Sequence, residues 1–336
     1  MTVLVTGGAG YIGSHTVVAL SEAGRRVVVL DDLSNSSERA VDAVRALVGA
    51  DVAFVRGDAA DVDLVSQAIV EHDVDEVVHF AAFKSVSESV ERPLAYFANN
   101  MGSLIGVVAA MADTGIGRLV FSSSCTVYGE PDEVPVTEAS PTGAANPYGW
   151  TKLHGEQFLA QVAAAGELDV MLLRYFNPVG AHPSGTIGED PHGIPENLVP
   201  YLMQVATGQL DRLRVFGDDY ETPDGTAVRD YLHVVDLAEG HVAALDALAS
   251  HPGCTAVNLG TGRGYSVLEV VTAAEAVLGR PIPHEVVGRR PGDVARIWAG
   301  TERAEQVLGW TATRDLAGML ADHWRWQEAN PDGFGD

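Results

Sequence analysis

Residues 2–13 read TVLVTGGAGYIG, so an apolar run rich in β-branched residues passes directly into a Gly-x-x-Gly-x-x-Gly turn. The apolar run predicts a buried strand, and the periodic apolar residues after the turn predict a helix. Gly7, Gly10 and Gly13 allow a sharp turn and let the backbone approach a pyrophosphate, whose charge then lies at the open N–H groups of the helix. The stretch predicts a dinucleotide-binding turn, and the alternative is a glycine-rich turn without a ligand.

The rest of the first half repeats this alternation of apolar strands with helical stretches. Near-continuous apolar runs occur at residues 27–30, 52–55, 77–80, 119–121 and 170–173. Runs of this kind are typical of strands that are buried on both faces. The predicted fold class is therefore α/β, a doubly wound parallel sheet of the Rossmann type.

A smaller lobe of mixed α/β structure is expected after residue 176, where the sequence becomes rich in proline and glycine. We place the dinucleotide-binding domain at residues 1–176, with a return of residues 229–262. The substrate-binding lobe then comprises residues 177–228 and 263–336. This division depends on the change in sequence texture alone.

Two elements are predicted within the returning segment. Asp236 precedes an apolar periodic run and is expected to cap a helix that extends to Ala249. Residues 257–259 predict a short strand that joins the main sheet.

The charge balance and the cysteine count argue against several functions. The chain has 46 acidic and 21 basic residues, and this net charge of −25 opposes binding to a nucleic-acid backbone. Cys125 and Cys254 have no metal-ligand spacing around them, so no metal site is expected. No apolar run approaches the roughly 18 residues of a membrane span, and the first strand follows Met1 without room for a signal peptide. We expect a cytoplasmic protein without a nucleic-acid or membrane partner.

Two acidic residues follow predicted strands where a dinucleotide would lie. Asp31 ends the second strand, where a carboxylate can accept hydrogen bonds from the adenosine ribose and repel a 2′-phosphate. This position favours NAD over NADP, and the alternative is that Asp31 only caps the strand. Asp58 follows the third strand and can accept from the adenine amino group, unless it is an ordinary turn residue.

Tyr148 and Lys152 form a Tyr-x-x-x-Lys pair, and a spacing of four places both side chains on one helix face. A nearby ammonium group favours the phenolate, so Lys152 and a positively charged nicotinamide are expected to lower the pKa of Tyr148 toward working pH. Ser122 and Ser124 end a predicted strand, at the sheet edge where ligands of this fold bind. Ser124 is predicted to relay a proton to Tyr148, although some of these hydroxyls can instead satisfy loop backbone groups.

With these motifs in order, the chain resembles the extended short-chain dehydrogenase/reductase family, and within it the nucleotide-sugar 4-epimerases. The resemblance extends over essentially the whole length. Its most specific segment is RYFNPVGAHPSG at residues 174–185, and further matching segments are GEDP at residues 188–191 and VRDY at residues 228–231.

The resemblance implies a bound NAD and a UDP-sugar substrate, and it carries their contacts over by position. The implied NAD contacts are Gly7, Gly10, Tyr11, Ile12, Gly13, Asp31, Asn35, Ser36, Asp58, Ala59, Phe80, Ala81, Lys84, Asn99, Ser122, Tyr148, Lys152 and Phe176. The implied substrate contacts are Lys84, Ser124, Tyr148, Asn177, Asn197, Leu198, Phe216, Arg229, Arg290, Asp293 and Ile297. Arginines at these positions can pair with the diphosphate, and a phenylalanine can pack on uracil.

Lysine is nearly absent from the chain, and both lysines fall on implied cofactor positions. Arginine supplies all the other basic residues, yet Lys84 and Lys152 are retained. A compact ammonium group is therefore expected to be required there, because a planar guanidinium has a different shape and hydrogen-bonding geometry.

The implied reaction is the interconversion of UDP-galactose and UDP-glucose through a bound 4′-keto sugar, with Tyr148 as the base. A 4,6-dehydratase is not supported, because that family carries an Asp-Glu pair where this chain has Cys125 and Thr126. A 4-epimerase for UDP-N-acetylhexosamine or a UDP-pentose stays open, because Ile297 is neither the bulky tyrosine that excludes an N-acetyl group nor the small cysteine that admits it. A non-catalytic NAD-binding regulator is the alternative from another class, and the intact Tyr148/Lys152 pair argues against it.

The resemblance also implies a homodimer. Its interface is expected to be a helix bundle that involves residues 94–111 and 153–163.

Overall fold

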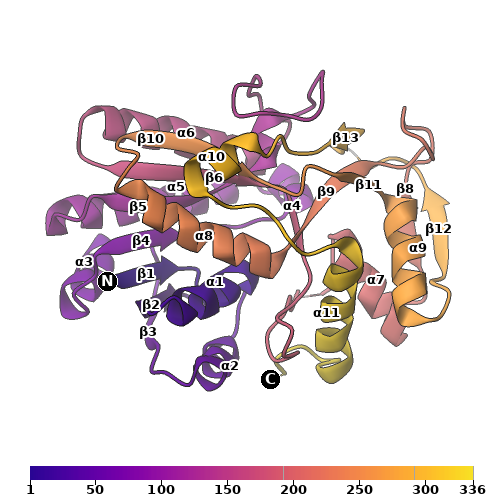
Figure 1. The fold of residues 1–336 in the computed structure, drawn as a ribbon, viewed down its shortest axis with the longest axis horizontal. Coiled ribbons are helices and arrows are strands. Elements are labelled where there is room, and N and C mark those ends of the chain that lie inside the picture. Colours follow the sequence, from indigo (N-terminus) through magenta and orange to yellow (C-terminus); the bar gives the residue numbers. More distant parts are fainter. Residues whose placement is uncertain (192, 291, 336) are drawn as a thin grey trace.

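The computed structural model describes residues 1–191, 193–290 and 292–335. Figure 1 shows a large sheet between helical layers in one half of the molecule and a smaller group of helices and short strands in the other half. The C-terminus lies beside the smaller group, near α11 (Leu316–Ala329). The site described below lies where the strands of the large sheet end.

The large sheet has seven strands, and every neighbouring pair is parallel. Strand order reverses across β1, so the predicted doubly wound α/β fold is confirmed. In sheet order the strands are β10 (Cys254–Leu259), β6 (Asp169–Tyr175), β5 (Arg118–Ser124), β4 (Glu76–His79), β1 (Thr2–Thr6), β2 (Arg26–Asp31) and β3 (Ala53–Arg56).

Helices cover both faces of this sheet. On one face α1 packs against α2 and α8, and on the other face α5 packs against α3 and α6. The helices in chain order are α1 (Tyr11–Glu22), α2 (Glu38–Val48), α3 (Val62–Glu71), α4 (Val86–Glu91), α5 (Pro93–Thr114), α6 (Pro147–Ala164), α8 (Val234–Leu248) and α10 (Glu302–Leu308).

Strand β1 explains why the sequence folds into layers. Its side chains are fully buried, and they alternate between two apolar cores: Val3 and Val5 belong to one, and Leu4 belongs to the other. Burial of one such side chain contributes about 1.5–3 kcal/mol. The continuous apolar pattern of this strand is thus the direct signature of a sheet covered on both faces.

The second lobe is built on shorter strands. A four-stranded sheet joins β7 (Asn177–Val179), β9 (Val228–His233), β11 (Gly264–Ser266) and β13 (Arg296–Ile297), and β8 (Leu213–Phe216) pairs with β12 (His284–Val287). Helices α7 (Leu198–Thr207), α9 (Val267–Leu278) and α11 pack on these strands around a third apolar core. The predicted strand at residues 257–259 is confirmed as part of β10 in the main sheet, whereas β9 belongs to the smaller sheet. The domain boundaries themselves stay a prediction.

The predicted helix after residue 236 is present, but its predicted cap is wrong. Helix α8 begins at Val234, and the ring of His233 caps it by accepting a hydrogen bond from the N–H of Val235 at 3.0 Å. Asp236 lies inside the helix, fully buried, and accepts hydrogen bonds from the N–H groups of Thr313 and Arg314. The Asp236 carboxylate therefore binds backbone groups that are distant in sequence. It does not cap the start of the helix, as the local sequence had predicted.

Helix α5 is the one helix among the described residues that is long and apolar enough to cross a membrane by length and composition alone. It has 22 residues and a mean hydropathy of 1.4 over its most apolar window, which suffices by length and composition. Half of that window is buried in the protein, where α5 packs against α3 and α6. Core helices of this kind pass the same test.

Candidate active site

The glycine turn between β1 and α1 is shaped by close backbone contacts. Gly7 has a φ of +69°, and a Cβ atom there would lie 2.8 Å from the backbone nitrogen of Ala81. A Cβ atom at Gly13 would lie 2.2 Å from the carbonyl oxygen of Gly7. Gly10 precedes the helix without a side-chain cap, so the first N–H groups of α1 are left for another partner. These features fit the pyrophosphate of a dinucleotide.

Asp31 connects this turn to the loop after β2. Its carboxylate accepts hydrogen bonds from the N–H of Ala9 at 3.0 Å, the N–H of Leu33 at 3.0 Å and the hydroxyl of Ser36 at 2.8 Å. A carboxylate has about four lone-pair positions, so these three donors leave capacity for a ribose hydroxyl. Asp31 thus satisfies donors of the protein itself and keeps a lone-pair position suited to a ribose hydroxyl; that it contacts NAD stays a prediction.

The other predicted cofactor residues follow the neighbouring strands of the same sheet edge. Asp58 is exposed after β3 and accepts from the N–H of Ala60 at 2.8 Å, as a turn residue does. Phe80 follows β4, and its ring centroid lies 4.8 Å from that of His241. The remaining members of this set are Tyr11 and Ile12 at the start of α1, the exposed Asn35, the buried Ala59, Ala81 after β4, Asn99 on α5, and Phe176 after β6.

Ser124, Tyr148 and Lys152 meet at the carboxyl end of β5. Ser124 is the last residue of the strand, and Tyr148 lies in the first turn of α6, which Asn146 caps by accepting from the N–H of Gly149 at 2.9 Å. Lys152 lies one turn further and donates from Nζ to the carbonyl oxygen of Ser122 at 2.7 Å. This bond ties α6 to the carboxyl end of β5.

Burial raises the pKa of Tyr148 to about 12, while a hydrogen bond with Ser124 acts in the opposite direction. Burial also lowers the pKa of Lys152 to about 7. The Nζ atom of Lys152 lies 5.9 Å from the centroid of the Tyr148 ring. In the protein alone, desolvation by burial therefore outweighs the groups that lower the pKa of Tyr148. That Lys152 and a bound nicotinamide together lower it stays a prediction.

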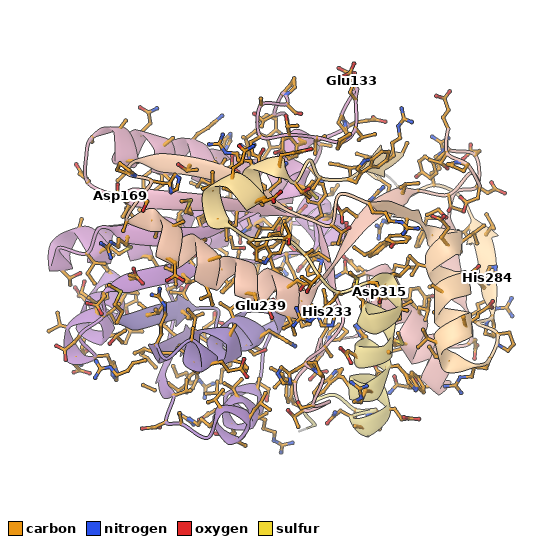
Figure 2. All side chains as sticks on the ribbon, viewed as in Figure 1. Glu133, Asp169, His233, Glu239, His284 and Asp315 are labelled. Atoms are coloured by element: carbon orange, nitrogen blue, oxygen red, sulfur yellow. The ribbon has the colours of Figure 1, made fainter. Side chains whose placement is uncertain are left out.

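Several of the predicted substrate residues come from separate segments of the second lobe. Asn177 lies on β7, Asn197 precedes Leu198 at the start of α7, Phe216 ends β8, and Arg229 lies on β9. Figure 2 labels His233 near the middle of the molecule, where β9 passes into α8 between the main sheet and the second lobe. The strand that carries Arg229 therefore runs along the junction of the two halves.

Arg290 lies beside Phe216 and Asp293, two other predicted substrate residues. Its guanidinium pairs with Asp293, with Nη2 2.9 Å from Oδ1 and Nε 3.2 Å from Oδ2. The same guanidinium carbon lies 5.4 Å from the centroid of the Phe216 ring. A cation stacked on an aromatic ring can hold a phosphate and a base together.

A cavity of about 470 Å³ lies beside Phe216 and Arg290. Several residues that line it were missed by the sequence analysis, because nothing in their spacing connects them: Ser87, Tyr201, Arg212 and Arg214. Ser87 lies on α4, more than 100 residues before Tyr201, Arg212 and Arg214 in the sequence, so only the folded chain brings it to the same cavity.

Ile297 lies in β13 directly beside Arg229 in the strand register. It is 3% exposed and belongs to an apolar cluster with Phe176, Cys125 and Leu153. The predicted specificity position therefore lies between a residue assigned to the cofactor and one assigned to the substrate.

A buried ion pair behind the catalytic helix was also missed. Arg174 donates from Nε and Nη2 to the carboxylate of Glu156 at 2.8 and 2.6 Å, and both side chains are nearly inaccessible. Glu156 lies one turn after Lys152 on α6. The motif at residues 174–185 contained a signal for Arg174, but its partner could not be read from local sequence.

Lys84 is half-exposed, and its Nζ atom lies 2.9 Å from Oε1 of Glu189. Asn197 donates to the same oxygen at 3.3 Å. Two predicted site residues are thus held by a third residue to which the sequence analysis gave no role.

Comparison with known proteins gives a consistent family assignment. The profile of the NAD dependent epimerase/dehydratase family matches residues 3–260. The UDP-glucose 4-epimerase of Bacillus subtilis is 53% identical over 335 residues, which cover 99% of each chain.

Solved structures give the same result. The crystal structure of UDP-glucose 4-epimerase from Bifidobacterium longum, in complex with NAD⁺ and UDP, has a TM-score of 0.96 and 49% identity. The match covers 99% of this chain and 100% of the Bifidobacterium chain. The enzyme of that name from Stenotrophomonas maltophila, with bound NAD and formylated UDP-arabinopyranose, has a TM-score of 0.97 and 50% identity, with coverage of 98% and 99%.

Proposed function

The chain belongs to the NAD dependent epimerase/dehydratase family, and on this premise we propose that it interconverts UDP-galactose and UDP-glucose. The observation that carries the proposal is the convergence of Ser124, Tyr148 and Lys152 at the carboxyl end of β5. Full-length similarity to enzymes named UDP-glucose 4-epimerase supports the same reaction.

Tyr148 is the base in this proposal. It takes the proton of the sugar 4′-hydroxyl, with Ser124 as the relay between the two oxygens. The glycine turn would hold NAD, which can accept the hydride from carbon 4′ and then return it. The positive charge of NAD would also favour the phenolate form of Tyr148. After the 4′-keto sugar has rotated in the site, Tyr148 returns the proton, and the configuration at carbon 4′ is inverted.

Rotation of the sugar requires that the rest of the substrate stays fixed. Arg229 and Arg290 are suited to hold the diphosphate, because guanidinium groups bind phosphate oxygens through two parallel hydrogen bonds. Phe216, stacked against Arg290, is suited to hold the uracil. The glycosidic bond to the diphosphate then serves as the axis about which the 4′-keto sugar turns.

A turnover assay without added NAD tests the function. The purified chain is incubated in parallel with UDP-galactose, UDP-N-acetylgalactosamine and UDP-xylose, and the products are separated. We expect UDP-glucose from UDP-galactose, with the highest catalytic efficiency of the three. Preferred turnover of another sugar would establish the alternative substrate, and no turnover of any would favour the non-catalytic regulator.

We also propose that two copies associate through α5 and α6. Leu94 and Ile105 are 82% and 49% exposed, and their spacing of eleven residues places them on one face of α5. Trp150 on α6 is 39% exposed, and its ring lies 5.4 Å from that of His154, which in turn contacts the ring of Phe97 on α5. An apolar and aromatic surface across two neighbouring helices is typical of a subunit interface.

Substitution of Leu94 tests the dimer. We expect Leu94→Glu to shift the mass measured by light scattering from dimer to monomer. The matched control is Val70→Glu on α3, because Val70 is also an exposed apolar residue, at 66%, outside this surface. A dimeric Leu94→Glu variant would contradict the proposed interface. The cytoplasmic location stays an expectation, which cell fractionation tests.

A further inference from the structure

Glu189 lies in the loop between β7 and α7 and is only 4% exposed. Its Oε1 atom accepts hydrogen bonds from Lys84 Nζ at 2.9 Å and from Asn197 Nδ2 at 3.3 Å. Lys84 follows β4 on the cofactor side, whereas Asn197 precedes α7 in the second lobe. One buried oxygen thus joins a residue from each side of the site.

The loop that carries Glu189 is held rigidly from behind. The indole N–H of Trp326 donates to the carbonyl oxygen of Glu189 at 3.1 Å, and Trp326 is 1% exposed. A Cβ atom at Gly188 would lie 2.3 Å from the Trp326 ring, so only glycine allows this approach. Asp190 accepts from the N–H of Phe334 at 3.0 Å and fixes the other side.

The second carboxylate oxygen of Glu189 is buried and has no hydrogen-bond partner among the residues that the structure describes. Its negative charge also affects Tyr11 at the start of α1. Burial, followed in size by the charge of Glu189, raises the pKa of the Tyr11 hydroxyl. A buried carboxylate oxygen without a hydrogen-bond partner destabilises the folded chain. Its presence directly beneath two site residues is better explained by function than by stability.

The hydrogen bond to Glu189 determines what Asn197 presents to a ligand. A carboxylate can only accept, so it fixes the amide group with Nδ2 toward Glu189. The carbonyl oxygen and one N–H of Asn197 then remain available. Without Glu189 the amide would be free to rotate by half a turn and exchange acceptor for donor.

We propose that Glu189 is a positioning residue that aims the Asn197 amide at the nucleotide sugar and holds the Lys84 ammonium beside the cofactor. This inference depends on the proposed function for the identity of the ligand. Glu189 acts through its two partners and does not touch the reacting atoms.

A double-mutant cycle between Glu189 and Asn197 tests the proposal. Dissociation constants for UDP-galactose are measured by calorimetry, and KM and kcat by turnover, for Glu189→Ala, Asn197→Ala and the double variant. We expect each single change to raise the dissociation constant and KM about tenfold, with a smaller change in kcat. The double variant should bind UDP-galactose no more weakly than the weaker-binding single variant, because Glu189 acts on the ligand through Asn197. Additive losses, or unchanged binding in Glu189→Ala, would overturn the proposal.

Two further variants separate positioning from folding. Asp190→Asn changes the neighbouring carboxylate of the same loop and should bind UDP-galactose as the parent chain does. Glu189→Gln retains an acceptor and the side-chain volume, so it should recover most of the binding lost in Glu189→Ala; binding as weak as that of Glu189→Ala would contradict the role. If Glu189→Ala does not fold, the cycle is run with Glu189→Leu, which removes the acceptor but keeps most of the side-chain volume, and additivity there overturns the proposal. Failure of the parent chain to convert UDP-galactose refutes the proposed function instead.

Discussion

The half of the molecule assigned to the cofactor and the half assigned to the substrate are built to recognise ligands with different parts of the chain. On the cofactor side the predicted site consists of the tightly packed backbone of the glycine turn and of an Asp31 carboxylate fixed by three donors. On the substrate side the groups are arginines, and Arg290 is 35% exposed and already paired with Asp293.

This difference has an energetic consequence. A site formed by packed backbone needs no rearrangement, so its affinity depends on steric fit. A site formed by long side chains must exchange internal ion pairs for contacts with the ligand, so its affinity depends on individual charges and on salt. Four predictions test this contrast.

Tyr148→Phe should have the largest effect, because it removes the proposed proton acceptor, on which both halves of the site depend. We expect kcat for UDP-galactose to fall about 10²- to 10⁴-fold, the usual contribution of a general acid–base group. Both binding sites should remain intact, so NAD stays bound and the affinity for UDP is retained. Turnover is measured by product separation, and near-normal epimerisation by this variant would refute the catalytic assignment.

Gly13→Ala should damage the cofactor half specifically. Its Cβ atom would lie 2.2 Å from the carbonyl oxygen of Gly7, so the turn must shift. Overpacking of this kind costs about 1–3 kcal/mol, which corresponds to a loss of NAD affinity of roughly 5- to 150-fold. The control is Gly102→Ala within α5, where the nearest atom is 4.0 Å away and NAD binding should not change. NAD released on denaturation is quantified, and full retention by Gly13→Ala would show that the turn does not hold the cofactor.

Arg290→Leu should damage only the substrate half. Loss of one charge-assisted contact costs about 1.5–3 kcal/mol, so KM should rise about 10- to 100-fold while kcat and bound NAD change little. Arg212→Leu is the matched control, since Arg212 lines the same cavity but is paired with Glu285 at 3.4 Å. An equal rise in KM for both variants would show that general positive charge, rather than the position of Arg290, governs binding.

Protonation of buried histidines should produce the smallest effect, a loss of stability at low pH that both halves of the molecule share. Burial lowers the pKa of His241 beside the cofactor residues and of His323 on α11 to about 4. Because these folded-state pKa values lie below the unfolded value, the unfolded chain takes up protons first as pH falls below 6.5. Stability is therefore lost on acidification, by about 1.4 kcal/mol per histidine at pH 5.5.

Urea denaturation at pH 7 and pH 5.5 measures this loss. His323→Gln and His241→Gln should each reduce the difference in the free energy of unfolding between the two pH values. An unchanged difference in both variants would show that these rings do not control the acid sensitivity.

The cofactor half could be predicted almost completely from the sequence, because its signals are local. The glycine turn, the acidic residue at the end of β2 and the four-residue spacing of Tyr148 and Lys152 are each contained in one short segment. Continuous apolar strands then determine where these segments meet, since the carboxyl ends of parallel strands share one edge.

The substrate half could be predicted only by resemblance. Phe216 and Arg290 are far apart in sequence, and no periodicity links them to Ser87 or Tyr201 on the same cavity. The false cap at Asp236 has the same origin, because its partners Thr313 and Arg314 lie 77 and 78 residues away. Local patterns carry no information about contacts of this length.

The sequence by itself determined the doubly wound sheet, the glycine turn and the placement of Tyr148 and Lys152 on one helix face, because these depend on burial periodicity and on spacing within single elements. Only the tertiary structure decided the electrostatics of that pair and the contacts of Glu189. Burial sets the pKa of Tyr148 at about 12 and that of Lys152 at about 7. Desolvation and long-range hydrogen bonds depend on which distant segments surround a group, and only the folded chain brings those segments together.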